Sequence, residues 1–483
     1  MKEKKSNIFY ILIIIIIFLS AFARFYYVDK RPLYFDEGTH WYTFINKIYM
    51  GEKIQYYPDF HGFTSWYLSA IPLFFLGSTV FAIRFMVALI GLLTIILIFL
   101  LKDKLGKFGI FLTALFMSIS PTFVFYSRQV SQYPYIIFFT LLSLIFIILY
   151  LERNKSFYLY LFSATLAFLI STHEIATIYI AILLSFIFFI YYFNPDGRKL
   201  ILKQIKKHKE ENFKTLIFSL ILFLLILILI MSSFFTNFKT FGEFLKQFSF
   251  QFDKSYDTGH NKNMFYYIKT FLILEIFAFL GTFLSLFFLK RNILSLFLFF
   301  WTFFSLIIFS IIPYKVPWMF MIVLLPMYLL SGLIFGNIIE KLKDKKIIKA
   351  IFYLILTGLF ILTSYNSVKL NFIYPTGDLK TNPLNYAGPT DDNYRLINDL
   401  KILIPNKSAK ILFVGDKLWP LQYYLRDYKN SFVEENASLE EYYQNYDIFI
   451  ITKNKYYDNK TFYKLGEYEL RQNYYIKILA KIS

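Results

Sequence analysis

Residues 8–28 read IFYILIIIIIFLSAFARFYYV, and residues 29–42 continue as DKRPLYFDEGTHWY. About 20 apolar residues in a helix cross a hydrocarbon core roughly 30 Å thick, so the first segment predicts a transmembrane helix. The second segment turns polar at once and carries two adjacent carboxylates, Asp36 and Glu37. The same change from apolar run to short polar segment recurs along the chain, which indicates a polytopic membrane protein.

The composition supports this interpretation. The chain of 483 residues is 57% hydrophobic and 17% charged, whereas soluble domains are about 45–50% apolar and about 25% charged. These values exclude a soluble multidomain enzyme. Eleven apolar stretches could span, near 8–28, 83–101, 108–125, 133–151, 157–172, 175–193, 215–235, 265–289, 293–312, 317–338 and 348–368. A further stretch within 63–82 is interrupted by Pro72 and is interpreted as interfacial; if it spans, every later segment changes sides.

The basic residues indicate the orientation. Every second connecting segment is rich in Lys and Arg, which mark the cytoplasmic side. These segments are 1–7, 102–107, 152–156, 194–214, 290–292 and 340–349, with 22 Lys or Arg against 8 Asp or Glu. They hold +14 of the net charge of +19, so the charge predicts a cytoplasmic N-terminus in a cell membrane and no nucleic-acid partner. A signal peptide cleaved near residues 21–23 is the alternative for the first span.

The C-terminal segment has a different character. Residues 369–483 contain mixed charges and turn residues, and eleven spans place them outside the cell. Apolar runs predict buried strands at 410–416 and 447–452, and helices at 419–428 and 439–445. The expected fold is therefore an all-α transmembrane domain, residues 1–368 with a polar first outer loop at 29–82, followed by a small external α/β domain. Because the chain has no cysteine, that domain must be stable without disulfides.

Asp36 and Glu37 are the most distinctive polar pair. Two adjacent acids at a membrane surface repel each other and are partly desolvated, which favours a raised pKa and a role as a base. A solvated acid pair or a helix N-terminal cap explains the same residues without catalysis.

Other ionisable and aromatic residues recur at the predicted outer ends of the spans. They are Lys53, His61, Arg128, His173, Glu174, His260, Lys315 and Trp318. Each could be an interfacial anchor. Together they suit a pocket for an anionic, lipid-linked substrate, in which Arg128 and Lys315 neutralise phosphate and a carboxylate activates an acceptor hydroxyl.

Several short motifs then resemble a known family. The segments Phe35-Asp36-Glu37, Ser127-Arg128 and Tyr314-Lys315-Val316-Pro317-Trp318 resemble the GT-C superfamily of polyprenyl-phosphate-sugar-dependent glycosyltransferases, especially the protein O-mannosyltransferase and aminoarabinose transferase branch. Within this branch, the sequence looks most like an archaeal group of flippase-activity-associated proteins, through His61-Gly62, Thr172-His173-Glu174, Gly259-His260, the segment from Lys315 to Trp318 and the segment from Trp419 to Tyr428. The resemblance covers most of the chain.

The resemblance implies a role for each matching residue. By this resemblance, Asp36 is the catalytic carboxylate and Glu37 supports it. Arg128 either binds the donor phosphate or stabilises the site. The Lys-Pro-Pro-Leu segment of the aminoarabinose branch is replaced by His61-Gly62-Phe63-Thr64, so phosphate neutralisation is expected from His61, Lys53 or Lys315. The Trp-Trp-Asp motif of oligosaccharyltransferases is absent, which argues against en bloc glycan transfer to Asn.

The expected function is inverting transfer of a sugar from a polyprenyl (dolichyl) phosphate to a hydroxyl on the outer face, with membrane lipids around the protein. The acceptor, a protein or a glycan, is not defined by the sequence. No cofactor is required, although Mg²⁺ or Mn²⁺ could bind the outer acids. A lipid-linked glycan transporter or flippase component, or a non-catalytic scaffold of a glycan-assembly complex, is the alternative.

Overall fold

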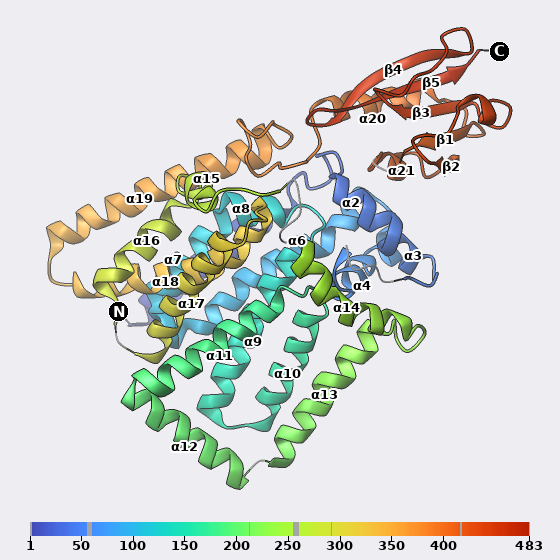
Figure 1. Cartoon of the computed structure of the whole chain (residues 1–483). Coiled ribbons are helices and arrows are strands. Elements are labelled where there is room, and N and C mark those ends of the chain that lie inside the picture. Colours follow the sequence, from blue (N-terminus) through green and yellow to red (C-terminus); the bar gives the residue numbers. More distant parts are fainter. Residues whose placement is uncertain are drawn as a thin grey trace.

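The computed structural model describes residues 2–55, 60–211, 213–254, 260–290, 292–415 and 418–482. A helical bundle is followed by a β sheet at one of its ends (Figure 1). The helices α1 to α10 are Lys2–Phe25, Phe35–His40, Asn46–Tyr49, Thr64–Ala70, Leu73–Leu76, Val80–Ile98, Lys102–Ile119, Pro121–Tyr126, Tyr133–Arg153 and Ser156–Ile170. Helices α11 to α19 are Ala176–Phe193, Pro195–Glu211, Phe213–Met231, Lys239–Lys254, Tyr266–Phe271, Ile276–Phe288, Ile293–Ile311, Phe320–Lys341 and Lys346–Val368. Short 3-10 or π turns, η1, η3, η4 and η5, occupy Trp41–Ile45, Phe99–Leu101, Pro317–Met319 and Lys369–Ile373.

The described residues contain eight helical stretches that are long and apolar enough to cross a membrane. One of them, Val80–Ile119, consists of α6, η3 and α7, and α7 is kinked at Gly106, whose φ of 72° lies in the left-handed region. The predicted polytopic helical fold is confirmed. Two of the eleven predicted spans, 157–172 and 265–289, correspond to the shorter helices α10 and α16.

Two predicted span boundaries were wrong. The stretch 108–125 ends at Ile119, because Ser120 caps a separate helix, α8, by accepting a hydrogen bond from the Phe123 amide at 3.2 Å. The stretch 265–289 is divided into α15 and α16, with Glu275 at the break. The interruption of 63–82 at Pro72 is observed, since α4 ends before Pro72 and α5 begins after it.

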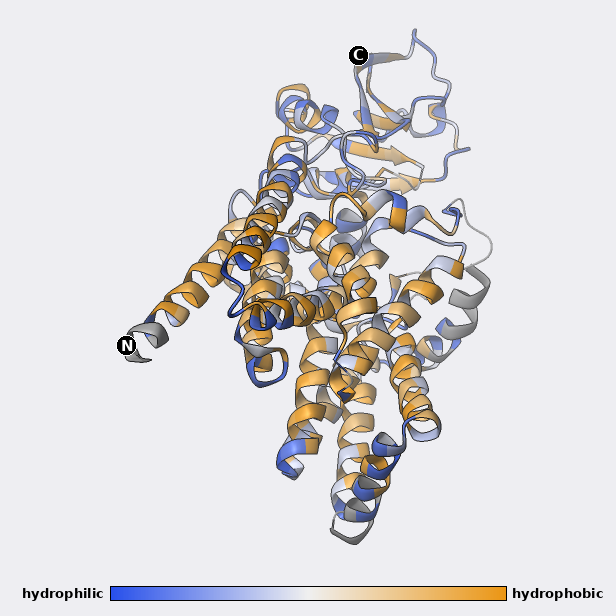
Figure 2. Cartoon of the chain, turned by 90° about the vertical axis from the view of Figure 1, so that its left-hand side faces the viewer, coloured by the Kyte–Doolittle hydropathy of each residue, from blue (hydrophilic) through white to orange (hydrophobic). Residues whose placement is uncertain are grey.

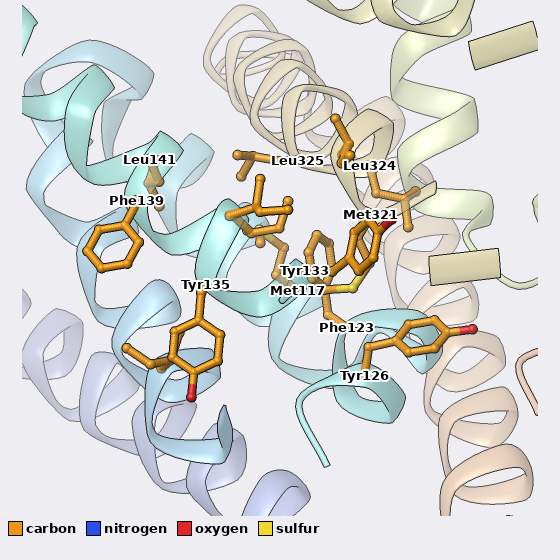
Figure 3. Packing of buried hydrophobic residues seen from close by; sticks show 14 of the residues in the cluster. Met117, Phe123, Tyr126, Tyr133, Tyr135, Phe139, Leu141, Met321, Leu324 and Leu325 are labelled. Atoms are coloured by element: carbon orange, nitrogen blue, oxygen red, sulfur yellow. The ribbon is translucent and has the colours of Figure 1, made fainter. Parts of the chain in front are cut away.

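Helix α18 is the centre of the bundle. Its spanning window is entirely buried, and it packs against α7, α16 and α17. Gly332 and Gly336 face Gly109 of α7 so closely that a Cβ at Gly336 would lie 2.8 Å from the Gly109 nitrogen. Small residues four apart allow such close helix packing inside a membrane. Figure 3 shows Met321, Leu324 and Leu325 of this helix among residues of α7, α8 and α9.

The polar residues lie mainly at helix ends and in the C-terminal part (Figure 2). The basic helix α12 lies at the end of the bundle away from the sheet (Figure 1). This separation agrees with basic loops on one side, while the orientation in the membrane stays a prediction.

The C-terminal part, described up to residue 482, forms a five-stranded mixed sheet in the order β2-β1-β3-β5-β4. The strands β1 to β5 are Lys410–Val414, Lys429–Val433, Ile448–Thr452, Phe462–Arg471 and Tyr474–Lys481, and helix α20 is Asp392–Leu403. Buried apolar clusters lie on both faces of β1 and β3, which explains why these strands read as continuous apolar runs. Both strand predictions are confirmed, except that Asp416 lies outside the described residues.

The two helices predicted in this part were wrong in extent. Of residues 419–428, only the single-turn helix α21, Leu421–Tyr424, is helical, and residues 439–445 contain only a 3-10 turn, η6, at Glu440–Tyr442. Pro420 restricts the backbone and lacks an amide proton, so the helix begins after it. The segment Trp419–Tyr424 instead packs against residues of the segment 29–82 that lie between α1 and α6. The Tyr424 hydroxyl accepts a hydrogen bond from the Leu33 amide at 2.8 Å, and Tyr423 donates to the Ser78 carbonyl at 3.1 Å.

Candidate active site

A pocket of about 470 Å³ opens beside α2, and five of the residues selected from the sequence line it. They are Asp36, His61, His173, Glu174 and Trp318. They come from α2, from the loop before α4, from the α10–α11 turn and from η4. The fold therefore brings together residues far apart in the chain at one end of the bundle, the end that carries the sheet (Figure 1).

Asp36 lies in the first turn of α2, half-buried, with Thr39 and His40 on the same helical face. A helix N-terminus favours a carboxylate through its unpaired amides and its dipole. Burial and, second, the charge of Asp36 raise the pKa of the Tyr314 hydroxyl, which lines the same pocket. The Asp36 carboxylate thus lies on the pocket wall near the Tyr314 hydroxyl, and Glu174 is the second carboxylate of the lining.

Glu37 points the other way, into the protein. Its carboxylate accepts two hydrogen bonds from Arg84 of α6, at 2.8 and 2.6 Å, and both side chains are fully buried. It also accepts from the backbone amides of Tyr34 at 2.8 Å and Val130 at 2.9 Å. Arg84 in turn donates to the carbonyls of Val28 and Arg31, which follow α1. This network fixes the loop that presents Asp36.

The pKa of Glu37 corrects one sequence expectation. Burial alone would raise the pKa of this carboxyl, but the Arg84 guanidinium outweighs burial and holds it below the usual range. The two adjacent acids do not share one environment, so mutual repulsion does not give Glu37 a raised pKa. Glu37 instead caps the start of α2, which is the non-catalytic explanation given for the acid pair. Its carboxylate accepts a hydrogen bond from the Tyr34 amide.

His61, His173 and Glu174 form a cluster at the far wall of the pocket. The Nδ1 atom of His61 lies 3.0 Å from Glu174 Oε1, and the Nδ1 atom of His173 lies 3.1 Å from Glu174 Oε2. The two imidazole rings stack with centroids 3.8 Å apart. Burial would raise the pKa of Glu174, but the neighbouring His173 and His61 outweigh it and lower the pKa. Glu174 is therefore an ionised carboxylate between two imidazoles.

Gly62 explains how the cluster assembles. Its amide donates to the Thr172 carbonyl at 3.1 Å, and the Thr64 amide donates to the Ser171 carbonyl at 3.2 Å. A Cβ at Gly62 would lie only 2.0 Å from the Ser171 oxygen. Only glycine allows the two backbones to approach this closely, and the approach places His61 against Glu174.

We expect Gly62→Ala to destabilise the protein by roughly 1–3 kcal/mol, because the added methyl group must push the two backbones apart. The separation should also break the His61–Glu174 contact. Thermal unfolding in detergent measures the first effect. Gly242→Ala is the matched control, because nothing lies within 4 Å of the position of its added Cβ. Equal melting temperatures for the two variants would contradict this account.

Besides Glu37, four of the sequence candidates do not line the pocket. Arg128 is buried and donates to the Ala23 carbonyl at 2.9 Å and the Tyr26 carbonyl at 2.7 Å, so its guanidinium caps the end of α1 rather than facing the pocket. This correction has a simple cause, since carbonyls at a helix end attract a cation. The Lys315 ammonium donates to the backbone carbonyls of Lys262 and Ile312.

His260 and Lys53 complete this group. The His260 Nδ1 atom lies 2.6 Å from the hydroxyl of Tyr386, and Gly259 of the same motif lies outside the described residues. Lys53 is exposed in the first outer loop and does not line the pocket. The expected phosphate contacts of Arg128, Lys315 and Lys53 therefore have no support in this geometry.

The sequence analysis gave no role to several pocket residues, among them His40, Gln132 and Tyr133, and it quoted Tyr314 only as part of a motif. Burial lowers the pKa of His40 to about 3, so this imidazole is neutral, and its Nδ1 atom has no hydrogen-bond partner among the described residues. The helical period could have found His40, because it lies four residues after Asp36. No sequence signal marks Tyr133, which reaches the pocket from the start of α9.

The helical bundle, the loop that carries Asp36 and the terminal sheet form an overall arrangement that is similar to solved structures of ArnT. Residues 61–232 match the family described as dolichyl-phosphate-mannose-protein mannosyltransferase. The match begins after Asp36. A comparison with curated proteins gave no match.

Solved structures agree over a longer part of the chain. ArnT from Cupriavidus metallidurans in the apo state is similar with a TM-score of 0.68 at 14% identity, over 100% of this chain and 98% of ArnT. ArnT bound to undecaprenyl phosphate gives 0.65 at 14% identity, over 99% and 98%. The archaeal oligosaccharyltransferase AglB from Archaeoglobus fulgidus, in complex with an inhibitory peptide and a dolichol-phosphate, gives 0.55 at 15% identity, over 93% of this chain and 70% of AglB. The GT-C resemblance is confirmed, while the closer likeness to the archaeal group stays a prediction.

Proposed function

We propose that this protein transfers a sugar from a polyprenyl phosphate to an acceptor hydroxyl on the outer face of the membrane, with inversion at the anomeric carbon. The observation that carries the proposal is the position of Asp36, a carboxylate at a helix N-terminus that faces a pocket of about 470 Å³. The pocket lies in a fold shared with proteins solved with undecaprenyl phosphate and with a dolichol-phosphate.

In the proposed reaction the acceptor oxygen attacks the anomeric carbon while the bond from that carbon to the phosphate oxygen breaks. The hydroxyl proton passes to the Asp36 carboxylate, and the polyprenyl phosphate leaves. A positioned base typically contributes about 10²- to 10⁴-fold to the rate. Glu37 is a positioning residue in this reaction, because its hydrogen bonds with Arg84, Tyr34 and Val130 fix the helix that carries Asp36.

The cluster of His61, His173 and Glu174 is a candidate site for a divalent cation. One donor atom from each residue lies within 4.8 Å of the others. Two imidazoles and a carboxylate fit Zn²⁺ or Mn²⁺ better than Mg²⁺, which prefers oxygen ligands. A bound ion would supply positive charge beside the leaving phosphate. No Lys or Arg is among the described residues that line the pocket, so no side chain there supplies this charge.

We expect the metal-stripped protein to bind about one Zn²⁺ per chain, and Glu174→Gln to weaken that binding at least about tenfold. Calorimetric titration of detergent-solubilised protein measures the affinity. Glu243→Gln is the control, since Glu243 is partly exposed and forms an ion pair with Lys246. Equal affinity in both variants would exclude the cluster. Transfer by the stripped protein then tests the expectation that no metal is required.

The function itself is tested with the protein reconstituted in vesicles and a short-chain polyprenyl-phosphate sugar. Transfer predicts release of free polyprenyl phosphate together with a glycosylated acceptor of inverted anomeric configuration, both visible by NMR. The transporter alternative predicts movement of the intact donor across the bilayer without release of phosphate. If the protein is a scaffold, we expect neither result, so a single vesicle preparation distinguishes the three functions.

A further inference from the structure

A second cleft, of about 630 Å³, lies between the first outer loop and the sheet domain. Three aromatic side chains line it, Tyr42 of η1, Trp419 and Phe432 of β2. Tyr42 is 39% and Phe432 40% exposed, although both are large aromatic residues. Their ring centroids are 5.9 Å apart, and those of Tyr42 and Trp419 are 5.1 Å apart. The cleft is thus a partly open aromatic surface built from the two ends of the chain.

Polar groups complete the lining. Glu434 and Glu435 follow β2, and Gln422 of α21 is only 2% exposed. The Gln422 Oε1 atom is buried and has no hydrogen-bond partner among the described residues. A buried acceptor without a partner is costly, so its presence in the lining of a cleft points to a ligand that donates a hydrogen bond.

The cleft and the Asp36 pocket share one wall. Asp36, Thr39 and His40 face the pocket, whereas Tyr42 faces the cleft. Gly38 packs against Pro420 so closely that a Cβ would lie 2.7 Å from it. The helical segment from α2 to η1 therefore separates the two sites, and both contact the same few turns.

We propose that this cleft binds a neutral saccharide and, resting on the proposed function, that this saccharide is part of the acceptor. Aromatic faces stack on the C–H faces of pyranose rings, while carboxylates and an amide oxygen accept hydrogen bonds from hydroxyls. The two carboxylates repel anionic sugars, and the described lining has no Lys or Arg to offset them. The chemistry selects a neutral sugar over a uronic acid or a sulfated sugar.

The binding test uses the full chain in detergent and titrates mannotriose, cellotriose and trigalacturonic acid by saturation-transfer NMR. We expect at least one neutral trisaccharide to bind and the uronic acid not to bind. Phe432→Ala should weaken binding about tenfold, the upper end of one aromatic contact. Tyr463→Ala is the control, because Tyr463 is an exposed aromatic residue on β4, at the opposite edge of the sheet.

A charge variant sharpens the test. Glu434→Gln/Glu435→Gln should allow trigalacturonic acid to bind, since the amides keep the shape and remove the repulsion. The amide oxygen introduced at the second position can still accept a hydrogen bond from the Thr452 hydroxyl, as the Glu435 carboxylate does at 2.9 Å. Failure of both neutral trisaccharides to bind, unchanged binding in Phe432→Ala, or binding of Ser/Thr peptides that no sugar displaces would overturn the proposal. Absence of transfer with sugar binding intact would overturn the proposed function instead.

Discussion

Asp36→Asn should reduce sugar transfer by about 10²- to 10⁴-fold while the protein stays folded in detergent. The amide has nearly the same shape as the carboxylate but cannot take up the acceptor proton. The loss should fall on kcat, because a base that acts on the reacting hydroxyl contributes in the transition state rather than in binding of the donor. Release of polyprenyl phosphate under saturating donor measures it.

Asp29→Asn is the matched control for this variant. Asp29 is an exposed acid of the same loop that forms an ion pair with Lys30, and its loss should leave transfer unchanged. Full activity of Asp36→Asn would show that Asp36 is not the base. A loss accompanied by a lower melting temperature would instead assign Asp36 a structural role.

Arg84→Met should destabilise the protein by about 3–5 kcal/mol, the usual cost of removing one partner from a buried ion pair. The variant leaves Glu37 charged and fully buried, with only the Tyr34 and Val130 amides as hydrogen-bond donors among the described residues. It also removes the donors to the carbonyls of Val28 and Arg31, so the loop that carries Asp36 loses its anchor. Thermal unfolding in detergent measures the effect.

The double variant Glu37→Gln/Arg84→Met separates the charge from the packing. It removes both charges, so it should be more stable than Arg84→Met alone even though it carries one more substitution. An additive loss would show that the pair is not coupled. The exposed pair of Lys246 and Glu243 provides a comparison, since exposed pairs contribute about 0–1 kcal/mol.

The helical part of the fold could be predicted from the sequence because apolar runs report spans directly. The short helices were harder, since hydropathy does not register the hydrogen bonds at the breaks. Ser120 accepts from the nearby Phe123 amide, whereas Glu275 accepts from the Thr122 amide, which is distant in the sequence. In the C-terminal part, β1 and β3 were found because they are buried on both faces. Strands β4 and β5 have mixed burial and many charged residues, so their sequences lack that signal.

The candidate site was predictable in its residue types but not in the direction of each side chain. Asp36 and Glu37 are adjacent, and one helical step turns the first to the pocket and the second to Arg84. Arg128 was selected because a cation suits phosphate, yet three backbone carbonyls of α1 and the following turn occupy its guanidinium. His61 was found, but its contact with Glu174 depends on the close approach at Gly62, which sequence spacing does not reveal.

The docking of Tyr424 onto Leu33 has a consequence for biosynthesis. The outer loop emerges from the ribosome early, but its partner is made almost 400 residues later. At about 5–20 residues per second the loop waits on the order of tens of seconds before that hydrogen bond can form. During this interval Arg84 and Val130, which are made sooner, are the contacts that hold it. Assembly of the site therefore follows the order of synthesis, with the buried ion pair first and the terminal domain last.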